Sequence, residues 1–214
     1  MDQGQNPFNT PMYAAVGRFA AVGPHVLGIE GGLSDNEADH GSWTKFGCSL
    51  PFLQDQAKAD PLVMQWFDQD GDGVIGAADI QALTSQQVLN LFFRCIWCRE
   101  LHLDMAMIPP TLDGAVFDQA VNDGPGAAIE LLQTSLNRFL IGVNLTVDGV
   151  FGPKSATALS TALNAGDPAS ALGRLLALYR QAAEERYNAI VRENPTQVVW
   201  LAGWVARARS LGDV

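Results

Sequence analysis

Capping side chains followed by prolines mark the start of one helix-like segment after another, while strand-like alternation is scarce. Thr10, Asp167 and Asn194 each precede a proline, the arrangement typical of a helix N-terminus. Apolar residues then recur every three or four positions, as Val88 and Leu91 do. The pattern predicts a mainly α fold.

The first segment predicts a helix that begins at Thr10, is interrupted or restarted at Pro24 and ends after Glu30, where two glycines follow. Residues 31–47 have no helical period, so we expect a loop or a short irregular hairpin there. Downstream, Thr84 stands three residues before a glutamine, which is the spacing of a capping box.

The Pro109-Pro110 pair predicts a boundary between a first domain, residues 1–110, and a helical second domain, residues 111–214. We expect helices in the second domain to begin near Pro125, Pro153, Pro168 and Pro195. The first of these is expected to reach Gly142, and the apolar face of the last is expected to include Val199 and Trp200.

The charge of the chain limits which macromolecules it can bind. Thirteen basic against 23 acidic side chains give a formal net charge of -10, which repels nucleic acid and anionic membranes. The first residues do not resemble a signal peptide, and no apolar stretch approaches the roughly 20 residues of a membrane span. We therefore expect a monomer that is made in the cytoplasm, binds no nucleic acid and does not insert stably into membranes.

The three cysteines do not form a disulfide framework, because their number is odd. Cys95 and Cys98 form a CxxC pair, but no second pair completes a zinc set. Within a helix this spacing places both on one face, so buried thiols are the favoured interpretation, and a metal or redox role is the alternative.

The segment from Glu30 to Gly47 contains four carboxylates. Glycoside hydrolysis needs a carboxylic acid that protonates the leaving oxygen and a second polar group that handles water. Glu30 suits the first role, since the negative end of a helix dipole and apolar neighbours both disfavour its ionised form. Asp39 and Thr44 follow in a loop that can fold back over it. Taken alone, the pattern also fits a solvated helix end without chemistry.

The segment DQDGDGVIGAAD, residues 68–79, follows the template of an EF-hand calcium loop. The expected ligands are Asp68, Asp70, Asp72, the carbonyl oxygen of Val74, and Asp79. Position 12 is an aspartate in place of the usual glutamate, so its carboxylate reaches less far. We expect a structural calcium ion; the alternative is an Asp/Gly-rich turn that binds no ion or binds magnesium weakly.

The segment EGGLSDNEADHGSWTKFG, residues 30–47, resembles the EGGYxxxxxDxGGxTxxG signature of glycoside hydrolase family 108, the phage-type N-acetylmuramidases. The resemblance implies Glu30 as the catalytic acid and assigns Asp39 and Thr44 to the Asp and Thr positions of the signature. Leu33 stands where the signature has an aromatic residue, and Ser42 where it has a glycine.

The resemblance extends to VDGVFGPKSATAL and to YNAIVRENPTQVVWLAGWVARA, which are similar to the family's peptidoglycan-binding C-terminal domain. By this resemblance, Asp148, Gly149 and Phe151 contact a glycan or a stem peptide. Alternatively, Phe151 fills the helical core together with Val147 and Val150.

The resemblance implies a lysozyme-like α(+β) catalytic domain with an EF-hand-like loop, followed by a small helical domain. The implied activity is that of an endolysin that hydrolyses the β-1,4 bond between N-acetylmuramic acid and N-acetylglucosamine of peptidoglycan, which it would reach through a holin pore. Two alternatives are a lytic transglycosylase and a non-catalytic, calcium-dependent wall-binding or chaperone-like protein of lysozyme-like shape.

Overall fold

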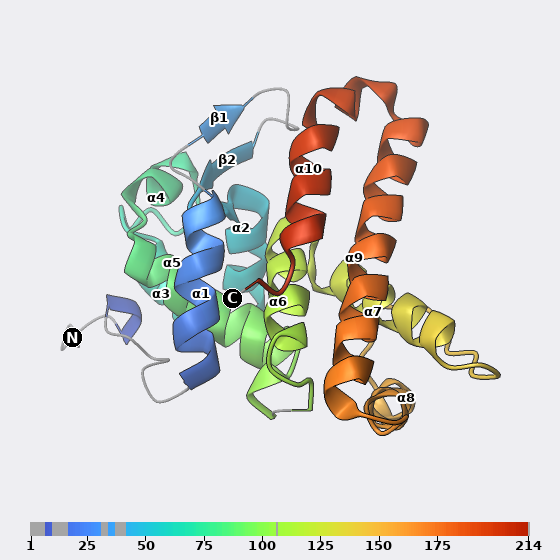
Figure 1. The fold of residues 1–214 in the computed structure, drawn as a ribbon. Helices are drawn as coiled ribbons and strands as arrows, with labels where there is room; N and C mark the ends of the chain where they lie inside the picture. Colours follow the sequence, from blue (N-terminus) through green and yellow to red (C-terminus); the bar gives the residue numbers. More distant parts are fainter. Residues whose placement is uncertain (1–6, 10–16, 31–33, 37–41, 106, 214) are drawn as a thin grey trace. The chain divides into compact units, whose positions relative to one another are not determined.

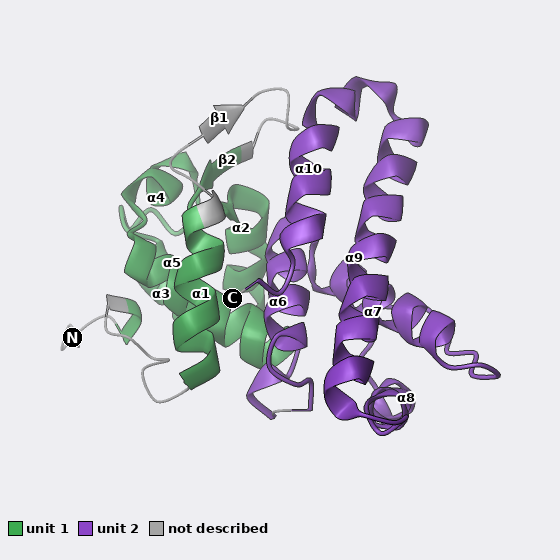
Figure 2. Ribbon diagram, in the orientation of Figure 1, with its two compact units in different colours: residues 1–100 green, residues 101–214 purple. Residues whose placement is uncertain are grey.

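The computed structural model describes residues 7–9, 17–30, 34–36, 42–105 and 107–213, and helices dominate among them (Figure 1). The contacts divide the chain into two compact units, residues 1–100 and 101–214 (Figure 2). The division falls after residue 100, whereas the Pro109-Pro110 pair predicted a domain boundary after residue 110.

The first unit combines short helices with one small sheet. Its elements are η1 (Pro7–Asn9), α1 (Gly17–Glu30), β1 (Ser34–Asn36), β2 (Ser42–Lys45), β3 (Cys48–Ser49), α2 (Leu50–Ala59), α3 (Pro61–Phe67), α4 (Ala77–Ala82), α5 (Ser85–Phe92) and the π-helix η2 (Phe93–Glu100). The strands are antiparallel in the order β1-β2-β3, with Ser34 opposite Thr44 and Lys45 opposite Cys48. The expected hairpin is therefore present, and β3 extends it by a strand that the sequence did not predict.

Aromatic side chains from α1 and η2 form part of the core of the first unit. Phe19 of α1 is fully buried, and its ring centroid lies 5.1 Å from that of Phe93 and 5.3 Å from that of Trp97. Val26, seven residues further along α1, is buried on the same side. Burial of this face holds α1 against the rest of the unit.

The predicted interruption at Pro24 is wrong, because α1 continues through this residue. Pro24 is exposed, while Val22 and Val26 on either side of it are buried. A proline in a helix removes one intrahelical hydrogen bond and disturbs the turn before it. Here the ring lies on the solvent side, where water can satisfy the freed carbonyl, and the buried neighbours keep the helix in place.

The second unit is helical. Its elements are η3 (Leu103–Met105), α6 (Leu112–Asp123), α7 (Pro125–Phe139), α8 (Pro153–Leu163), α9 (Pro168–Glu193), η4 (Pro195–Gln197) and α10 (Val198–Ser210). Helices begin at Pro125, Pro153 and Pro168 as predicted, although α7 ends three residues before Gly142. Across the described ranges, no helix is both long and apolar enough to span a bilayer.

The predicted apolar face of the last helix is wrong at its first turn. Val199 is 72% exposed and Trp200 is 45% exposed. The contact is made further along α10, where Trp204 stacks on Tyr187 of α9 with 5.5 Å between ring centroids. Periodicity in the sequence does not define which part of this face meets a neighbouring helix.

A buried ion pair connects α10 to α6. Two guanidinium nitrogens of Arg207, Nε and Nη2, lie 2.7 and 2.6 Å from Oδ1 of Asp118, and Nη1 donates to Asn122 at 3.1 Å. The side chains of Arg207 and Asp118 are only 12% and 4% exposed. Removing one partner of such a pair leaves the other charge buried without compensation.

We expect Arg207→Met to lower the free energy of unfolding by about 3 kcal/mol, because Asp118 loses its charged partner inside the unit. Arg209→Met is the matched control on the same helix, since Arg209 is 68% exposed in its pair with Glu184 and should contribute less than about 1 kcal/mol. Urea titration of the whole chain, followed by circular dichroism, measures both. Equal losses in the two variants would contradict the structural role of the buried pair.

Candidate functional site

The end of α1 and the central strand of the sheet bring two of the three expected catalytic positions, Glu30 and Thr44, into one region. Glu30 is the last residue of α1, and Thr44 of β2 pairs with Ser34, the first residue of β1. Since Ser34 follows Glu30 by four residues, the chain separates their Cα atoms by at most about 14 Å. The pairing therefore returns Thr44 to the neighbourhood of the helix end. The side chain of Glu30 and all of Asp39 lie outside the described residues.

Thr44 is half-buried and lies between two strands. On the side opposite β1 it pairs with Ser49 of β3. Ser49 is also the N-cap of α2, where its hydroxyl accepts from the amide of Phe52 at 3.4 Å. The strand that carries Thr44 is thus joined directly, through Ser49, to the start of α2.

The acidic loop between α3 and α4 gathers three carboxylates. Asp68, Asp70 and Asp79 each place one oxygen within 4.8 Å of the other two. Calcium binds oxygen ligands at about 2.3–2.6 Å, so two ligands of one ion lie at most about 5 Å apart. Gly71 and Gly73, with φ of 73° and 84°, provide the sharp turns. These carboxylates therefore fit a divalent cation of this size.

Asp79 is the buried member of the group, at 1% exposure. Its carboxylate accepts from the amides of Gln69 at 2.7 Å and Gly76 at 2.8 Å, and the second bond caps the N-terminus of α4. Asp72 lies outside the convergent set, and its carboxylate accepts from the amide of Val74 at 2.8 Å. Val74, whose carbonyl is the remaining expected ligand, has an exposed side chain.

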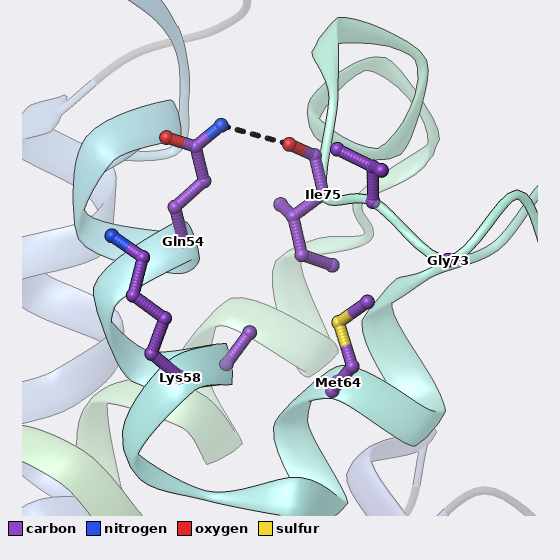
Figure 3. A pocket seen from close by; sticks show the side chains of 7 residues that line it. Gln54, Lys58, Met64, Gly73 and Ile75 are labelled. Atoms are coloured by element: carbon purple, nitrogen blue, oxygen red, sulfur yellow. Dashed lines mark hydrogen bonds between the residues drawn. The ribbon is translucent and has the colours of Figure 1, made fainter.

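A largely apolar hollow of about 400 Å³ lies beside the acidic loop, and no sequence pattern pointed to it (Figure 3). Gln54 and Lys58 of α2, Met64 of α3 and Ile75 of the loop are among the residues that line it. The side-chain amide of Gln54 donates to the carbonyl of Ile75 at 2.9 Å. Through this bond, α2 holds the loop just before α4 begins.

In the second unit, Gln133 of α7 organises the turn that contains Asp148 and Gly149. Its side chain is 1% exposed; Oε1 accepts from the amides of both residues at 3.0 and 3.1 Å, and Nε2 donates to Asp148 Oδ1 at 2.8 Å. This last bond holds the pKa of Asp148 below its usual range. Gly149 has a φ of 72°, and a Cβ there would lie 3.0 Å from the carbonyl oxygen of Gly126. Asp148 and Gly149 therefore shape the turn.

Two hollows meet at the start of α8, where both are lined by Gly152 and Pro153. One, of about 360 Å³, has polar residues such as Lys154 in its wall. The other, of about 480 Å³, is mainly apolar and is lined by Phe151 and Met107, among others. Of the three expected substrate contacts, Asp148 lines the first hollow and Phe151 lines the second.

The alternative in which Val147 and Val150 fill the helical core is wrong. They are 46% and 64% exposed, and Phe151 is half-buried. The hydrogen bonds of Gln133 to Asp148 and to the carbonyl of Val150 hold this turn, and the two valine side chains lie exposed on it.

The thiols behave as buried apolar groups. Cys48 and Cys95 are fully buried, and Cys98 is half-buried. Burial raises the pKa of the Cys48 thiol well above its usual range and that of Cys95 to about 11. Because the thiolate is the nucleophile, a raised pKa disfavours attack by either thiol on a disulfide near pH 7. The CxxC pair lies on the π-helix η2, where an α-helix was expected.

Comparison with known families gives two matches. Residues 24–124 match the family described as Glycosyl hydrolase 108, and residues 127–209 match the one described as Predicted Peptidoglycan domain. The first match contains Glu30, Thr44 and the acidic loop, and the second contains the turn held by Gln133.

Among solved structures, SagA from Brucella abortus has the same fold, with a TM-score of 0.63 and 23% sequence identity over 92% of this chain and 93% of that one. No curated protein matches the chain. The expected mainly α architecture, with a lysozyme-like first part and a helical second part, is confirmed. The chain thus carries a glycosyl hydrolase family 108 domain followed by a peptidoglycan-binding domain, and it is a glycoside hydrolase that acts on peptidoglycan.

Proposed function

We propose that this enzyme is a muramidase of the endolysin type, which hydrolyses the β-1,4 bond between N-acetylmuramic acid and N-acetylglucosamine. The observation that carries the proposal is the position of Glu30 at the end of α1, inside the family 108 match, with the strand of Thr44 folded back toward it. The family match disfavours the non-catalytic alternative.

In the proposed reaction, Glu30 protonates the oxygen of the leaving sugar as the glycosidic bond breaks. Positive charge develops on the other sugar, and a water molecule completes the hydrolysis. Asp39 and Thr44 are the groups we assign to hold that water. A carboxylate and a hydroxyl suit the task, because both accept its hydrogen bonds and the carboxylate also favours the developing charge.

Glu30→Gln should reduce the clearing of purified sacculi by at least about 10²-fold, because the amide keeps the shape of the side chain but has no proton to give. The melting temperature should not change. Glu100→Gln is the control, since it removes a carboxylate of η2 that is 44% exposed in a pair with Arg99. A folded Glu30→Gln protein that keeps more than about a tenth of the wild-type rate would show that another group is the acid.

The released fragments decide the reaction type. Hydrolysis adds water and leaves a reducing N-acetylmuramic acid, whereas a lytic transglycosylase closes the C6 hydroxyl onto the same carbon and leaves an anhydro sugar. Mass spectrometry of muropeptides from the wild-type digestion distinguishes the two. Mainly anhydro products would contradict the muramidase proposal and support the transglycosylase alternative, in which Glu30 is still the acid.

We further propose that the acidic loop binds calcium as a structural ion. Support comes from the convergence of Asp68, Asp70 and Asp79 within one coordination sphere, together with the loop's EF-hand spacing. Without a cation, three carboxylates at this distance repel one another, and an ion would remove that repulsion.

Calcium at a hundredfold excess over its Kd should stabilise the folded protein by about 2.7 kcal/mol. The melting temperature should then rise by roughly 5–10 °C, and EDTA should reverse the rise. Asp70→Ala should abolish the response, while Asp55→Ala, which removes a 71% exposed aspartate of α2 outside the loop, should retain it. A wild-type melting curve that responds to neither calcium nor EDTA contradicts the site.

For the second unit, we propose that the hollow lined by Phe151 contacts peptidoglycan. Its apolar wall suits the methyl-bearing groups of the polymer, and the neighbouring hollow offers polar partners. Asp148 and Gly149 contribute by shaping the turn that presents both hollows.

Phe151→Ala should weaken sedimentation of the protein with sacculi at least about fivefold, which corresponds to about 1 kcal/mol of lost contact. The measurement uses the Glu30→Gln background, in which the sacculi stay intact. Ile141→Ala is the control, because it truncates a fully exposed apolar side chain of the same unit. Equal binding of the two variants, at unchanged melting temperatures, would place the contact elsewhere.

A further inference from the structure

A lysine on the strand of Thr44 reaches the helix that follows the acidic loop. Lys45 Nζ donates to the carbonyl oxygen of Gln81 at 2.6 Å, across 36 residues of sequence. Gln81 lies in the last turn of α4, where carbonyls have no partner within the helix. The positive charge of the ammonium group also interacts favourably with the negative end of the helix dipole. Lys45 therefore caps α4 and joins β2 to it.

The other end of α4 is held independently. The buried carboxylate of Asp79 accepts from Gly76 at the N-cap and from Gln69 across the loop. One residue before the cap, Ile75 receives the hydrogen bond from Gln54 of α2 (Figure 3). Asp79 and Ile75 lie two and six residues before Gln81, so these contacts make the carbonyl that Lys45 contacts a fixed point of the first unit.

The small sheet needs a fixed contact of this kind on a neighbouring element. β2 has four residues, and its neighbours β1 and β3 have three and two. Ladders this short are marginally stable without further packing, because few hydrogen bonds offset the entropy of ordering the strands. A displacement of about 1 Å in a group that positions a reactant can reduce the rate by up to about 10²-fold.

We propose that Lys45 is a positioning residue for hydrolysis: its bond to the Gln81 carbonyl anchors β2 on α4 and so keeps the Thr44 hydroxyl in its working position. The inference rests on the proposed function, in which Thr44 helps to hold the water. Lys45 itself touches neither substrate nor water in this scheme. Its effect on the rate passes through Thr44 alone.

Lys45→Met keeps the length and the apolar stem of the side chain but removes the ammonium group. We expect kcat to fall about tenfold, with KM for sacculi changed less than twofold, since the variant leaves the binding surfaces intact. Lys45→Arg keeps a charged donor and should recover at least half of the wild-type kcat. Lys58→Met removes a lysine of α2 that is 76% exposed, and it should change neither constant.

A double-mutant cycle with Thr44→Val distinguishes positioning from a general loss of stability. If Lys45 acts through Thr44, the double variant should be no slower than Thr44→Val alone. Any of three results would overturn the inference. The losses in kcat of the two single variants could multiply in the double variant, Lys45→Met could keep the wild-type kcat, or Thr44→Val could be fully active.

The Glu30→Gln variant tests the proposed function separately. An active Glu30→Gln protein would contradict the muramidase site itself. If Glu30→Gln is inactive while Lys45→Met is fully active, only the proposed role of Lys45 is contradicted.

Discussion

Backbone groups at helix ends have no partner in the backbone of their own helix, and at α4 two side chains supply those partners, one from the helix itself and one from a neighbouring strand. Asp79 accepts from the amide of Gly76, and Lys45 donates to the carbonyl of Gln81, so α4 is held at both ends. The Asp79 bond is part-buried and the Lys45 bond is exposed, so the Asp79 bond is the stronger constraint, because a backbone group left unpaired away from water costs about 1–3 kcal/mol. The Lys45 bond joins the sheet to α4, Asp79 joins α4 to the acidic loop, and Gln54 joins α2 to the same loop through Ile75. The position of the candidate catalytic strand depends on this set of bonds.

The second unit achieves rigidity by different means. Its longer helices pack along their length, and the buried pair of Arg207 and Asp118 connects α10 to α6. One buried side chain, Gln133, shapes the exposed turn before α8 by accepting from two backbone amides and donating to Asp148. Separate catalytic and binding units suit an insoluble polymer, because binding by one unit keeps the other at a high local concentration of substrate.

Local order in this chain could be predicted because it depends on residues a few positions apart. The capping box of Thr84 and Gln87 is present, with bonds of 2.9 and 3.2 Å in the two directions. Helix α9 begins at Pro168, as its cap predicted, and α1 ends at Glu30. The spacing of the acidic loop likewise predicted which carboxylates could converge, although Asp72 points its carboxylate into a local turn.

Periodicity and capping predicted the mainly α fold, the starts of α7, α8 and α9, and the end of α1 at Glu30, since both act within one or two helical turns. The continuation of α1 through Pro24 and the exposure of Trp200 could not be predicted in this way, because both depend on which face a neighbouring element covers. The same holds for the contact between Lys45 and Gln81, whose partners are 36 residues apart. No local pattern specifies such a pair; it forms when packing brings a free carbonyl within reach of a long side chain.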